Sequence, residues 1–237
     1  MTPDVAVVVG VSGGIGHAIA QQLADDPRYG RVVDLSRRSP ANWPRDHWIE
    51  ADMLDEASLH AAAERLGAIG PVTRIVVATG VLHRPGRGPE KSMRSLSLDA
   101  LTDLFVVNAA GPALVAKHLL PLTPRDRPSL YAALSARVGS IGDNQLGGWY
   151  GYRASKAALN MLVRTLAIEH RRTRPFGVCV ALHPGTVDTP LSAPFQSGVP
   201  DLFTPARSAH ALLAVMDSLG PSDNGGFFAW DGSVIAW

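Results

Sequence analysis

The stretch VVVGVSGGIG, residues 7–16, joins a run of β-branched residues to the start of a helical pattern. A tight strand-to-helix turn requires glycine, and a bound pyrophosphate requires bare backbone beside the amides of a helix N-terminus. Gly10, Gly14 and Gly16 meet this need in the order G-x-x-x-G-x-G, which differs from the familiar G-x-G-x-x-G. Because a strand pattern precedes the glycines and a helix pattern follows them, we interpret the stretch as a dinucleotide-binding loop rather than a turn without a ligand.

Short apolar runs alternate with longer helical patterns along the rest of the chain. The patterns predict strands over 5–10, 31–36, 47–52, 74–79, 129–135, 177–185 and 225–230. They predict helices over 13–26, 58–67, 98–120 (bent at 111–112) and 206–219, and a further helix that begins within 147–162. Strands that are apolar on both faces are typical of a parallel sheet covered by helices. We therefore expect a single α/β domain over 1–237, a doubly wound Rossmann fold, with 190–205 as a substrate loop or lid.

Composition limits the classes of function. The 237 residues are 46% hydrophobic and 18% charged, which is enough apolar material for a substantial core. The net charge of +1 and the absence of a long basic run disfavour a nucleic-acid partner. One cysteine, Cys179, excludes an internal disulfide, and no zinc spacing occurs, so no metal is expected. With no leader pattern and no uninterrupted apolar run of membrane length, we expect a cytoplasmic protein with no membrane partner.

The end of the second predicted strand, VVDLSRRSP, bears on the choice of dinucleotide. An acidic residue at the strand tip would bind the ribose hydroxyls of NAD, whereas an arginine would pair with the 2′-phosphate of NADP. Asp34 lies inside the strand, and Arg37 and Arg38 follow its tip. We favour NADP over NAD, with Arg37 at the ribose; solvated surface arginines are the alternative. Asp52, after the third strand, either accepts from the adenine amino group, caps the next helix or is a turn residue.

Tyr152 and Lys156 lie four residues apart in GGWYGYRASKAALNML, residues 147–162. On a helix, residues at this spacing face the same way. A free tyrosine has a pKa of about 10, and a neighbouring ammonium lowers it toward the range useful for acid–base catalysis. A core tyrosine beside a lysine that reaches water is the alternative. The pair is a weak signal alone but a strong one together with the glycine loop.

These features together resemble the short-chain dehydrogenase/reductase family. The resemblance rests on GVSGGIG at 10–16, ADM at 51–53, VVNAAG at 106–111, YRASK at 152–156 and HPGTVDT at 183–189. Within the family, ATGVLH at 78–83 and the stretch from 134 to 160 are similar to the C-factor-like branch. The resemblance implies an NADP-preferring oxidoreductase, such as a carbonyl reductase, that moves hydride between the nicotinamide and a small-molecule carbonyl or secondary alcohol. It also implies a homodimer or homotetramer.

The resemblance assigns roles to single residues. Tyr152 would be the general acid or base, Lys156 would lower its pKa and bind the nicotinamide ribose, and Asn108 would hold a water of the proton relay. The cofactor-binding set that we predict comprises Gly10, Ser12, Gly13, Gly14, Ile15, Gly16, Ser36, Arg37, Asp52, Met53, Ala78, Thr79, Gly80, Tyr152, Lys156, Pro184, Gly185, Thr186, Val187 and Thr189.

The chain departs from the family at two places. VATG at 77–80 replaces the family's N-N-A-G, and Ser135-Ala136 replaces the Ser-Ser pair whose second member binds the substrate carbonyl. We predict that Ser135 takes the catalytic serine role through a bulge or strand end, with Ser140 as the other candidate. The departure leaves a second hypothesis open: a dinucleotide-binding signalling or redox-sensing protein with little catalytic activity.

Aromatic residues surround the predicted site. Trp149, Tyr150, Phe195 and Phe203 form either an apolar substrate wall or part of the core or a subunit interface. We also expect Trp237 to pack against the body of the protein or a neighbouring subunit.

Overall fold

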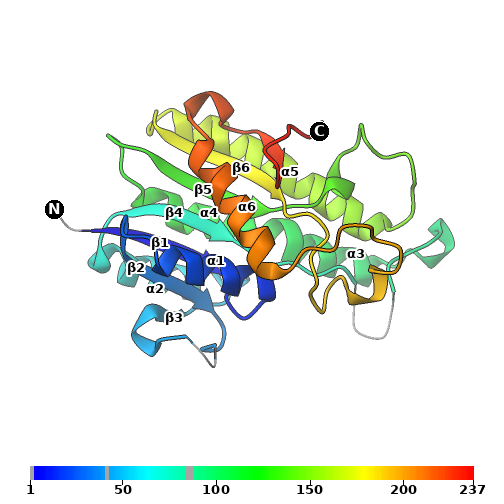
Figure 1. Ribbon diagram of the computed structural model, residues 1–237, viewed down its shortest axis with the longest axis horizontal. Coiled ribbons are helices and arrows are strands. Elements are labelled where there is room, and N and C mark those ends of the chain that lie inside the picture. Colours follow the sequence, from blue (N-terminus) through cyan, green and yellow to red (C-terminus); the bar gives the residue numbers. More distant parts are fainter. Residues whose placement is uncertain (1–2, 41–42, 84–87) are drawn as a thin grey trace.

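Seven strands form one parallel sheet in the described residues of the computed structural model, which are 3–40, 43–83 and 88–237. The order across the sheet is β3-β2-β1-β4-β5-β6-β7. The strands are β1 (Asp4–Val9), β2 (Tyr29–Ser36), β3 (Trp48–Glu50), β4 (Val72–Val77), β5 (Ser129–Leu134), β6 (Gly177–His183) and β7 (Phe227–Ala229). Their amino ends lie on the left of Figure 1 and their carboxyl ends on the right. This arrangement confirms the doubly wound Rossmann prediction.

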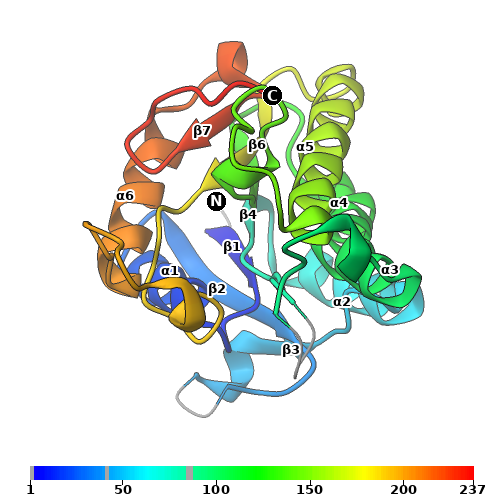
Figure 2. The ribbon, with the colours of Figure 1, turned by 90° about the vertical axis from the view of Figure 1, so that its right-hand side faces the viewer.

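Helices cover both faces of the sheet (Figure 2). One face carries α1 (Gly14–Ala24) and α6 (Pro205–Ser218), and the other carries α2 (Glu56–Ile69), α4 (Gly111–Leu119) and α5 (Tyr150–Arg171), with α3 (Leu98–Phe105) outside. The strands alternate their side chains between these layers, so that Val5, Val7 and Val9 face the α2/α4/α5 layer while Ala6 and Val8 face the α1/α6 layer. The two apolar layers hold the sheet rigid, which fixes where each strand ends.

The predicted stop of the second helix at Gly67 is wrong, because α2 continues to Ile69 and ends at Gly70. Ile69 packs against the core cluster on this face, so burial of its side chain extends the helix beyond the glycine. The helix begins at the side chain of Asp55, which accepts hydrogen bonds from the amides of Ala57 and Ser58.

The predicted bend of the long helix lies slightly earlier than 111–112. A π-helical turn, Val106–Ala110, separates α3 from α4. Pro112 has no N–H group, so the carbonyl of Asn108, four residues earlier, cannot receive the usual helical hydrogen bond. The combined segment Leu98–Leu122 is long and apolar enough, by length and composition, to cross a bilayer. Here the α4 part of that segment packs against the sheet.

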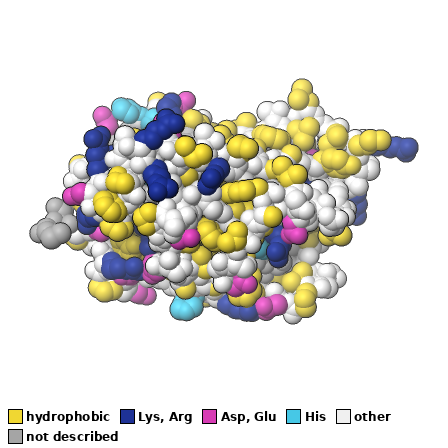
Figure 3. Space-filling model, turned by 90° about the horizontal axis from the view of Figure 1, so that it is seen from above, with side chains coloured by type: hydrophobic (Ala, Val, Ile, Leu, Met, Phe, Trp, Pro, Cys, Tyr) yellow, Lys and Arg dark blue, Asp and Glu magenta, His cyan; other side chains and the backbone are white. Residues whose placement is uncertain are grey.

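The C-terminal segment closes the far edge of the sheet. The ring of Trp237 stacks on Phe227 with centroids 5.6 Å apart, as expected for a residue packed on the body of the protein. The carbonyl oxygen of Trp237 accepts a hydrogen bond of 2.9 Å from the amide of Gly142. On the face drawn in Figure 3, hydrophobic and charged side chains are interspersed, in keeping with the small net charge.

Candidate active site

Two cavities lie at the carboxyl ends of the strands, the end that faces the viewer in Figure 2. The first, of about 690 Å³, lies where the strand order reverses between β1 and β4, the position at which doubly wound sheets bind ligands. It is lined by these predicted cofactor residues: Gly10, Ser12, Gly13, Ser36, Arg37, Asp52, Met53, Ala78, Thr79 and Gly80. Arg38, which follows Arg37 at the strand tip, lines it as well. The lining residues that were missed from the sequence are Val9, Leu35, Ala51, Leu54, Val81 and Val107.

The glycine loop is closed on itself. Gly10 has a φ of 100°, a conformation that favours glycine, and its carbonyl oxygen accepts a bond of 3.0 Å from the amide of Gly13. A Cβ atom at Gly16 would lie under 3.0 Å from the Gly10 carbonyl. The first helix has no side-chain cap at Gly13, so its first amides stay available to an anion. The glycine loop therefore leaves a space that fits a pyrophosphate. Side chains at the glycine positions would fill that space.

Asp34 does not reach the first cavity. Its carboxylate is fully buried, where it accepts hydrogen bonds from the amide of Val11 at 3.3 Å and the hydroxyl of Ser36 at 2.5 Å. Burial raises the pKa of this carboxyl. The residue thus ties the second strand to the glycine loop, while Arg37 and Arg38 line the cavity in front of it.

Asp52 borders the adenosine side of the same cavity. Its Oδ1 accepts a bond of 3.0 Å from the amide of Leu54, so it acts as a turn residue. The helix-cap alternative is wrong, because Asp55 caps α2. An adenine contact remains compatible with its position. Behind it, Thr79 donates a hydrogen bond of 3.3 Å to the sulfur of Met53.

The second cavity, of about 450 Å³, borders Tyr152. It is lined by the predicted nicotinamide-end residues Ile15, Pro184, Gly185, Thr186, Val187 and Thr189. Four further polar residues line it and were not among the predicted site residues: Arg137, Asp143, Arg153 and His183. They come from the loop after β5, the first turn of α5 and the tip of β6. Arg153 and His183 lie inside the YRASK and HPGTVDT motifs, which was the only signal for them in the sequence. Gly14, Gly16 and Lys156 lie behind the two cavities rather than on their walls.

Tyr152 and Lys156 lie on one face of α5, as expected. The ammonium of Lys156 is 5.9 Å from the Tyr152 ring centroid and donates a bond of 2.8 Å to the Leu134 carbonyl. Burial raises the pKa of Tyr152 to about 12 and lowers the pKa of Lys156 to about 8. The expected lowering of the tyrosine pKa is therefore absent from the protein alone, because desolvation outweighs the lysine charge at this distance.

Asn108 is fully buried, and its side-chain amide is bonded within the protein. Its Oδ1 accepts from the amide of Val81 at 2.8 Å, and its Nδ2 donates to the Val81 carbonyl at 2.8 Å and to Ser155 at 3.0 Å. Pro112 leaves the main-chain carbonyl of Asn108 without its usual helical donor. The relay water at Asn108 stays a prediction. Gly80 makes room for the group, since a Cβ there would lie 3.3 Å from both Asn108 Oδ1 and Lys156 Nζ.

Neither candidate serine is bonded to Tyr152. The hydroxyl of Ser135 donates a bond of 2.7 Å to Oδ1 of Asn160 on α5. The hydroxyl of Ser140 accepts from the amide of Asp143 at 3.1 Å. No bulge re-aims the Ser135 hydroxyl toward the tyrosine in the described structure. Ser135 and Ala136 both line the cavity, and Ala136 stands at the position of the family's serine.

An aromatic wall separates Tyr152 from the 190–205 segment. Trp149 has a left-handed backbone, with φ of 51°, and its amide donates to the carbonyl of Glu90. Its ring centroid is 4.9 Å from Phe195 and 6.3 Å from Tyr152. A left-handed backbone conformation is unfavourable for a bulky residue. The hydrogen bond from the Trp149 amide to Glu90 helps to stabilise this conformation and so keeps the ring at the cavity.

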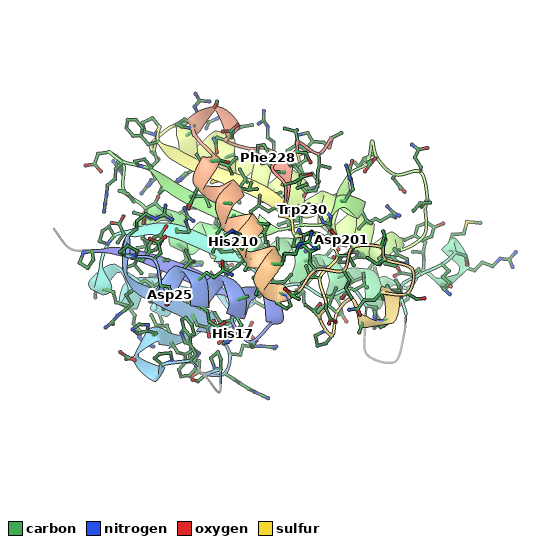
Figure 4. All side chains as sticks on the ribbon, in the orientation of Figure 1. His17, Asp25, Asp201, His210, Phe228 and Trp230 are labelled. Atoms are coloured by element: carbon green, nitrogen blue, oxygen red, sulfur yellow. The ribbon has the colours of Figure 1, made fainter. Side chains whose placement is uncertain are left out.

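Phe203 belongs to a different cluster. It is 2% exposed, and its ring centroid is 4.7 Å from that of Trp230. Arg207 stacks on Phe203 and pairs with Asp201, which lies near Trp230 in Figure 4. The substrate-wall prediction thus fits Trp149 and Phe195, whereas Phe203 anchors the end of the segment in the core.

Lys156→Met is expected to stabilise the protein while lowering activity. A lysine pKa lowered from 10.5 to about 8 costs the folded state roughly 3 kcal/mol at pH 7. The lost bond to Leu134 offsets about 1 kcal/mol of the gain. Urea unfolding should therefore show the variant to be more stable by about 2 kcal/mol at pH 7.

The sign of this effect depends on pH. The wild type gains stability between pH 8 and 10.5 as Lys156 loses its proton, so the advantage of the variant should vanish near pH 10.5. Lys91→Met, at an exposed position, is the control and should change stability by less than about 0.5 kcal/mol. A Lys156→Met protein that is less stable than the wild type at pH 7 would contradict the buried-charge cost.

Comparisons with known proteins agree with this geometry. A family profile described as short chain dehydrogenase matches residues 4–199. The chain is 31% identical over 234 residues, 98% of each chain, to 1-hydroxy-2-glutathionyl-2-methyl-3-butene dehydrogenase of Rhodococcus sp. strain AD45. It is 40% identical to C-signal of Myxococcus xanthus over 135 residues, which cover 56% of this chain and 76% of C-signal.

Two solved structures are similar over the full length of both chains. The NADPH-bound carbonyl reductase from chicken fatty liver superposes with a TM-score of 0.84 at 25% identity. A putative short-chain dehydrogenase/reductase from Burkholderia multivorans with bound NADP superposes with a TM-score of 0.80 at 28% identity.

Proposed function

Because this chain belongs to the short-chain dehydrogenase family, we propose that it is an NADP-preferring oxidoreductase that interconverts a small-molecule carbonyl and a secondary alcohol. The observation that carries the cofactor preference is the pair of arginines, Arg37 and Arg38, on the wall of the first cavity, with Asp34 buried behind them. The two solved structures of similar fold that hold NADPH or NADP support the same choice.

The residues present fit a dinucleotide. The uncapped amides near Gly13 and the bare backbone at Gly10 suit a pyrophosphate, and the residues from Pro184 to Thr189 suit the nicotinamide end. When bound, the nicotinamide supplies or accepts the hydride. Tyr152 then donates its phenolic proton to the carbonyl oxygen in reduction and takes it back in oxidation. Lys156 holds its positive charge beside the tyrosine, and the Asn108 carbonyl orients a water through which the proton is replaced.

The lining of the second cavity favours a substrate with an apolar part. Trp149, Leu82 and Phe195 line it, and Arg137 and Asp143 form an ion pair of 2.9 Å on its wall. The relative from Rhodococcus is named for a hydroxy compound that also carries a glutathionyl group. We propose an amphipathic alcohol or carbonyl, handled by a cytoplasmic homodimer or homotetramer.

A second candidate function is a dinucleotide-binding signalling or redox-sensing protein with little turnover. Ala136 at the serine position and the similarity to C-signal favour it. Tight NADPH binding without reduction of any member of a broad carbonyl panel would support this reading over the enzyme.

The test of the proposal is a fluorescence titration of the purified protein with NADPH and with NADH. Tighter binding of NADPH is expected. Arg37→Ser should raise the Kd for NADPH by about 10–100-fold, since a charge-assisted hydrogen bond is worth roughly 1.5–3 kcal/mol, and leave the Kd for NADH unchanged.

Arg65→Ser, on the exposed side of α2 and outside both cavities, serves as the control and should alter neither constant. Equal binding of both cofactors by the wild type would move the ribose contact to the backbone and end the NADP preference.

A further inference from the structure

At the tip of β5, the serine hydroxyl that donates a hydrogen bond to the substrate carbonyl in the family is replaced by Ala136. Ala136 has no polar atom in its side chain, and the Ser135 hydroxyl is used by Asn160. A carbonyl oxygen that gains negative charge during hydride transfer needs a donor in addition to the acid that protonates it. Some other side chain on the cavity must supply that bond if the site is an efficient catalyst.

His183 lies on the strand tip next to this position. The amide of Ser135 donates a bond of 2.7 Å to the carbonyl of Leu182, so the two strand tips are adjacent and His183 follows on β6. Its ring lines the same cavity as Tyr152 and Ala136. The imidazole is thus presented to the substrate from the strand beside the one that should carry the serine.

The two ring nitrogens are in different surroundings. Nδ1 is buried and has no hydrogen-bond partner among the described residues. Because the ring borders the cavity while Nδ1 is closed off from it, Nε2 is the nitrogen that can reach a bound substrate. A proton on Nδ1 would be a buried donor without an acceptor, whereas a proton on Nε2 can be bonded in the cavity.

We propose that neutral His183 donates a hydrogen bond from Nε2–H to the substrate carbonyl oxygen, in place of the serine that this chain lacks. The inference rests on the proposed carbonyl reduction. A bound NADPH would supply the hydride to the carbonyl carbon and become NADP⁺, the carbonyl oxygen would gain the C–O π electrons, and Tyr152 would donate the proton to that oxygen. His183 keeps its own proton throughout, as a neutral imidazole can when it polarises a carbonyl.

The charges around His183 keep it neutral. Burial and the positive charge of Arg137 lower its pKa to about 4, and the opposing effect of Asp231 is smaller. A neutral donor with a high second pKa does not compete with Tyr152 as the acid. Across the neutral pH range, Tyr152 therefore acts as the acid and His183 only as a hydrogen-bond donor.

The experiment is a two-by-two set of full-length proteins: wild type, His183→Ala, Ala136→Ser and the double variant. Turnover is measured at saturating NADPH with the fastest-reduced member of a panel of aryl aldehydes, cyclic ketones and quinones. His183→Ala should lower kcat by about 10²-fold, as for loss of an oxyanion donor, and leave the Kd for NADPH within about 3-fold. Ala136→Ser should restore at least about 10-fold of that loss in the double variant, because it returns the missing hydroxyl.

Matched variants separate this role from packing. His210→Ala removes an exposed histidine of α6 that lies outside both cavities, and it should change kcat by less than about 3-fold. His183→Gln keeps an N–H donor and should stay within about 10-fold of wild type, and it replaces the alanine variant if that protein fails to fold. In the imidazole 15N spectrum of the wild type, assigned by comparison with His183→Gln, a neutral ring protonated on Nε2 is expected at pH 7.

Three results would overturn the proposal. A His183→Ala protein that keeps more than about a third of the wild-type kcat would remove the donor role while leaving the proposed function intact. An Nδ1-protonated or charged ring would do the same. A wild type that binds NADPH but reduces no panel member would reject both the enzyme and the donor.

Discussion

Replacing Tyr152 with phenylalanine is expected to lower kcat by about 10²–10⁴-fold and to leave the Kd for NADPH within about 3-fold of wild type. The hydroxyl is the group on the second cavity that can protonate a carbonyl oxygen, and burial raises its pKa to about 12, so it carries its proton at neutral pH. Phenylalanine keeps the ring that packs against Trp149. Stopped-flow or steady-state turnover with NADPH, beside a fluorescence titration, measures both quantities.

Tyr150→Phe is the matched control, because Tyr150 lies two residues earlier, is 39% exposed and does not line the cavity. It should keep full turnover. Full activity in Tyr152→Phe would mean that water or another side chain protonates the product, and the acid–base assignment would be lost.

The fold could be predicted from the sequence because its signals are local and repeated. Runs such as VAVVVG need burial on both faces, and the helical patterns between them place helices on both sides of the sheet. The placement of the glycine loop and the Tyr152–Lys156 pair followed from spacing alone, since a turn and a helix face are short-range geometry.

The parts that failed depend on contacts between distant segments. Ser135 lines the cavity, but its hydroxyl is bonded to Asn160, 25 residues away on α5, and the local sequence does not show that bond. The lysine was expected to lower the tyrosine pKa, yet desolvation of both groups dominates, and burial cannot be read from a spacing of four residues. Arg137 and Asp143 gave no motif of their own, and HPGTVDT did not single out His183, because these residues gather only when the tips of β5 and β6 meet.

The raised pKa of Tyr152 and the lowered pKa of Lys156 also show which of the two residues affects the free energy of unfolding. Both values describe a tyrosine and a lysine desolvated side by side, each held in its neutral direction by burial. At neutral pH the cost to stability comes from Lys156, because Tyr152 is neutral there in both the folded and the unfolded state. The stability difference expected for Lys156→Met and the turnover loss expected for Tyr152→Phe are therefore two measurements of one arrangement.

Gly16→Ala is expected to weaken NADPH binding by more than about 10²-fold and to lower the free energy of unfolding by about 2 kcal/mol. The new Cβ would lie under 3.0 Å from the carbonyl of Gly10 and 3.2 Å from the Cβ of Ala78. The Cβ would meet backbone on one side and a packed strand end on the other. Neither can shift without a large cost in free energy, so the glycine loop must open. Opening of the glycine loop separates Gly10 from the start of α1. The amides near Gly13 then no longer point together at the pyrophosphate.

Gly67→Ala provides the comparison that makes this result specific. Gly67 lies inside α2, where an added Cβ meets only Leu122 at 3.7 Å, so the substitution should raise stability by about 0.5–1 kcal/mol and leave NADPH binding unchanged. Both variants add one methyl group to a helical glycine, and only the surroundings differ. If Gly16→Ala bound NADPH as tightly as the wild type, the closed loop would not be what holds the cofactor, and the preference attributed to Arg37 would need a different binding pose. If Gly16→Ala lost NADPH binding without losing stability, the methyl group would be blocking the cofactor directly rather than opening the turn. A urea titration beside the NADPH titration tells these cases apart.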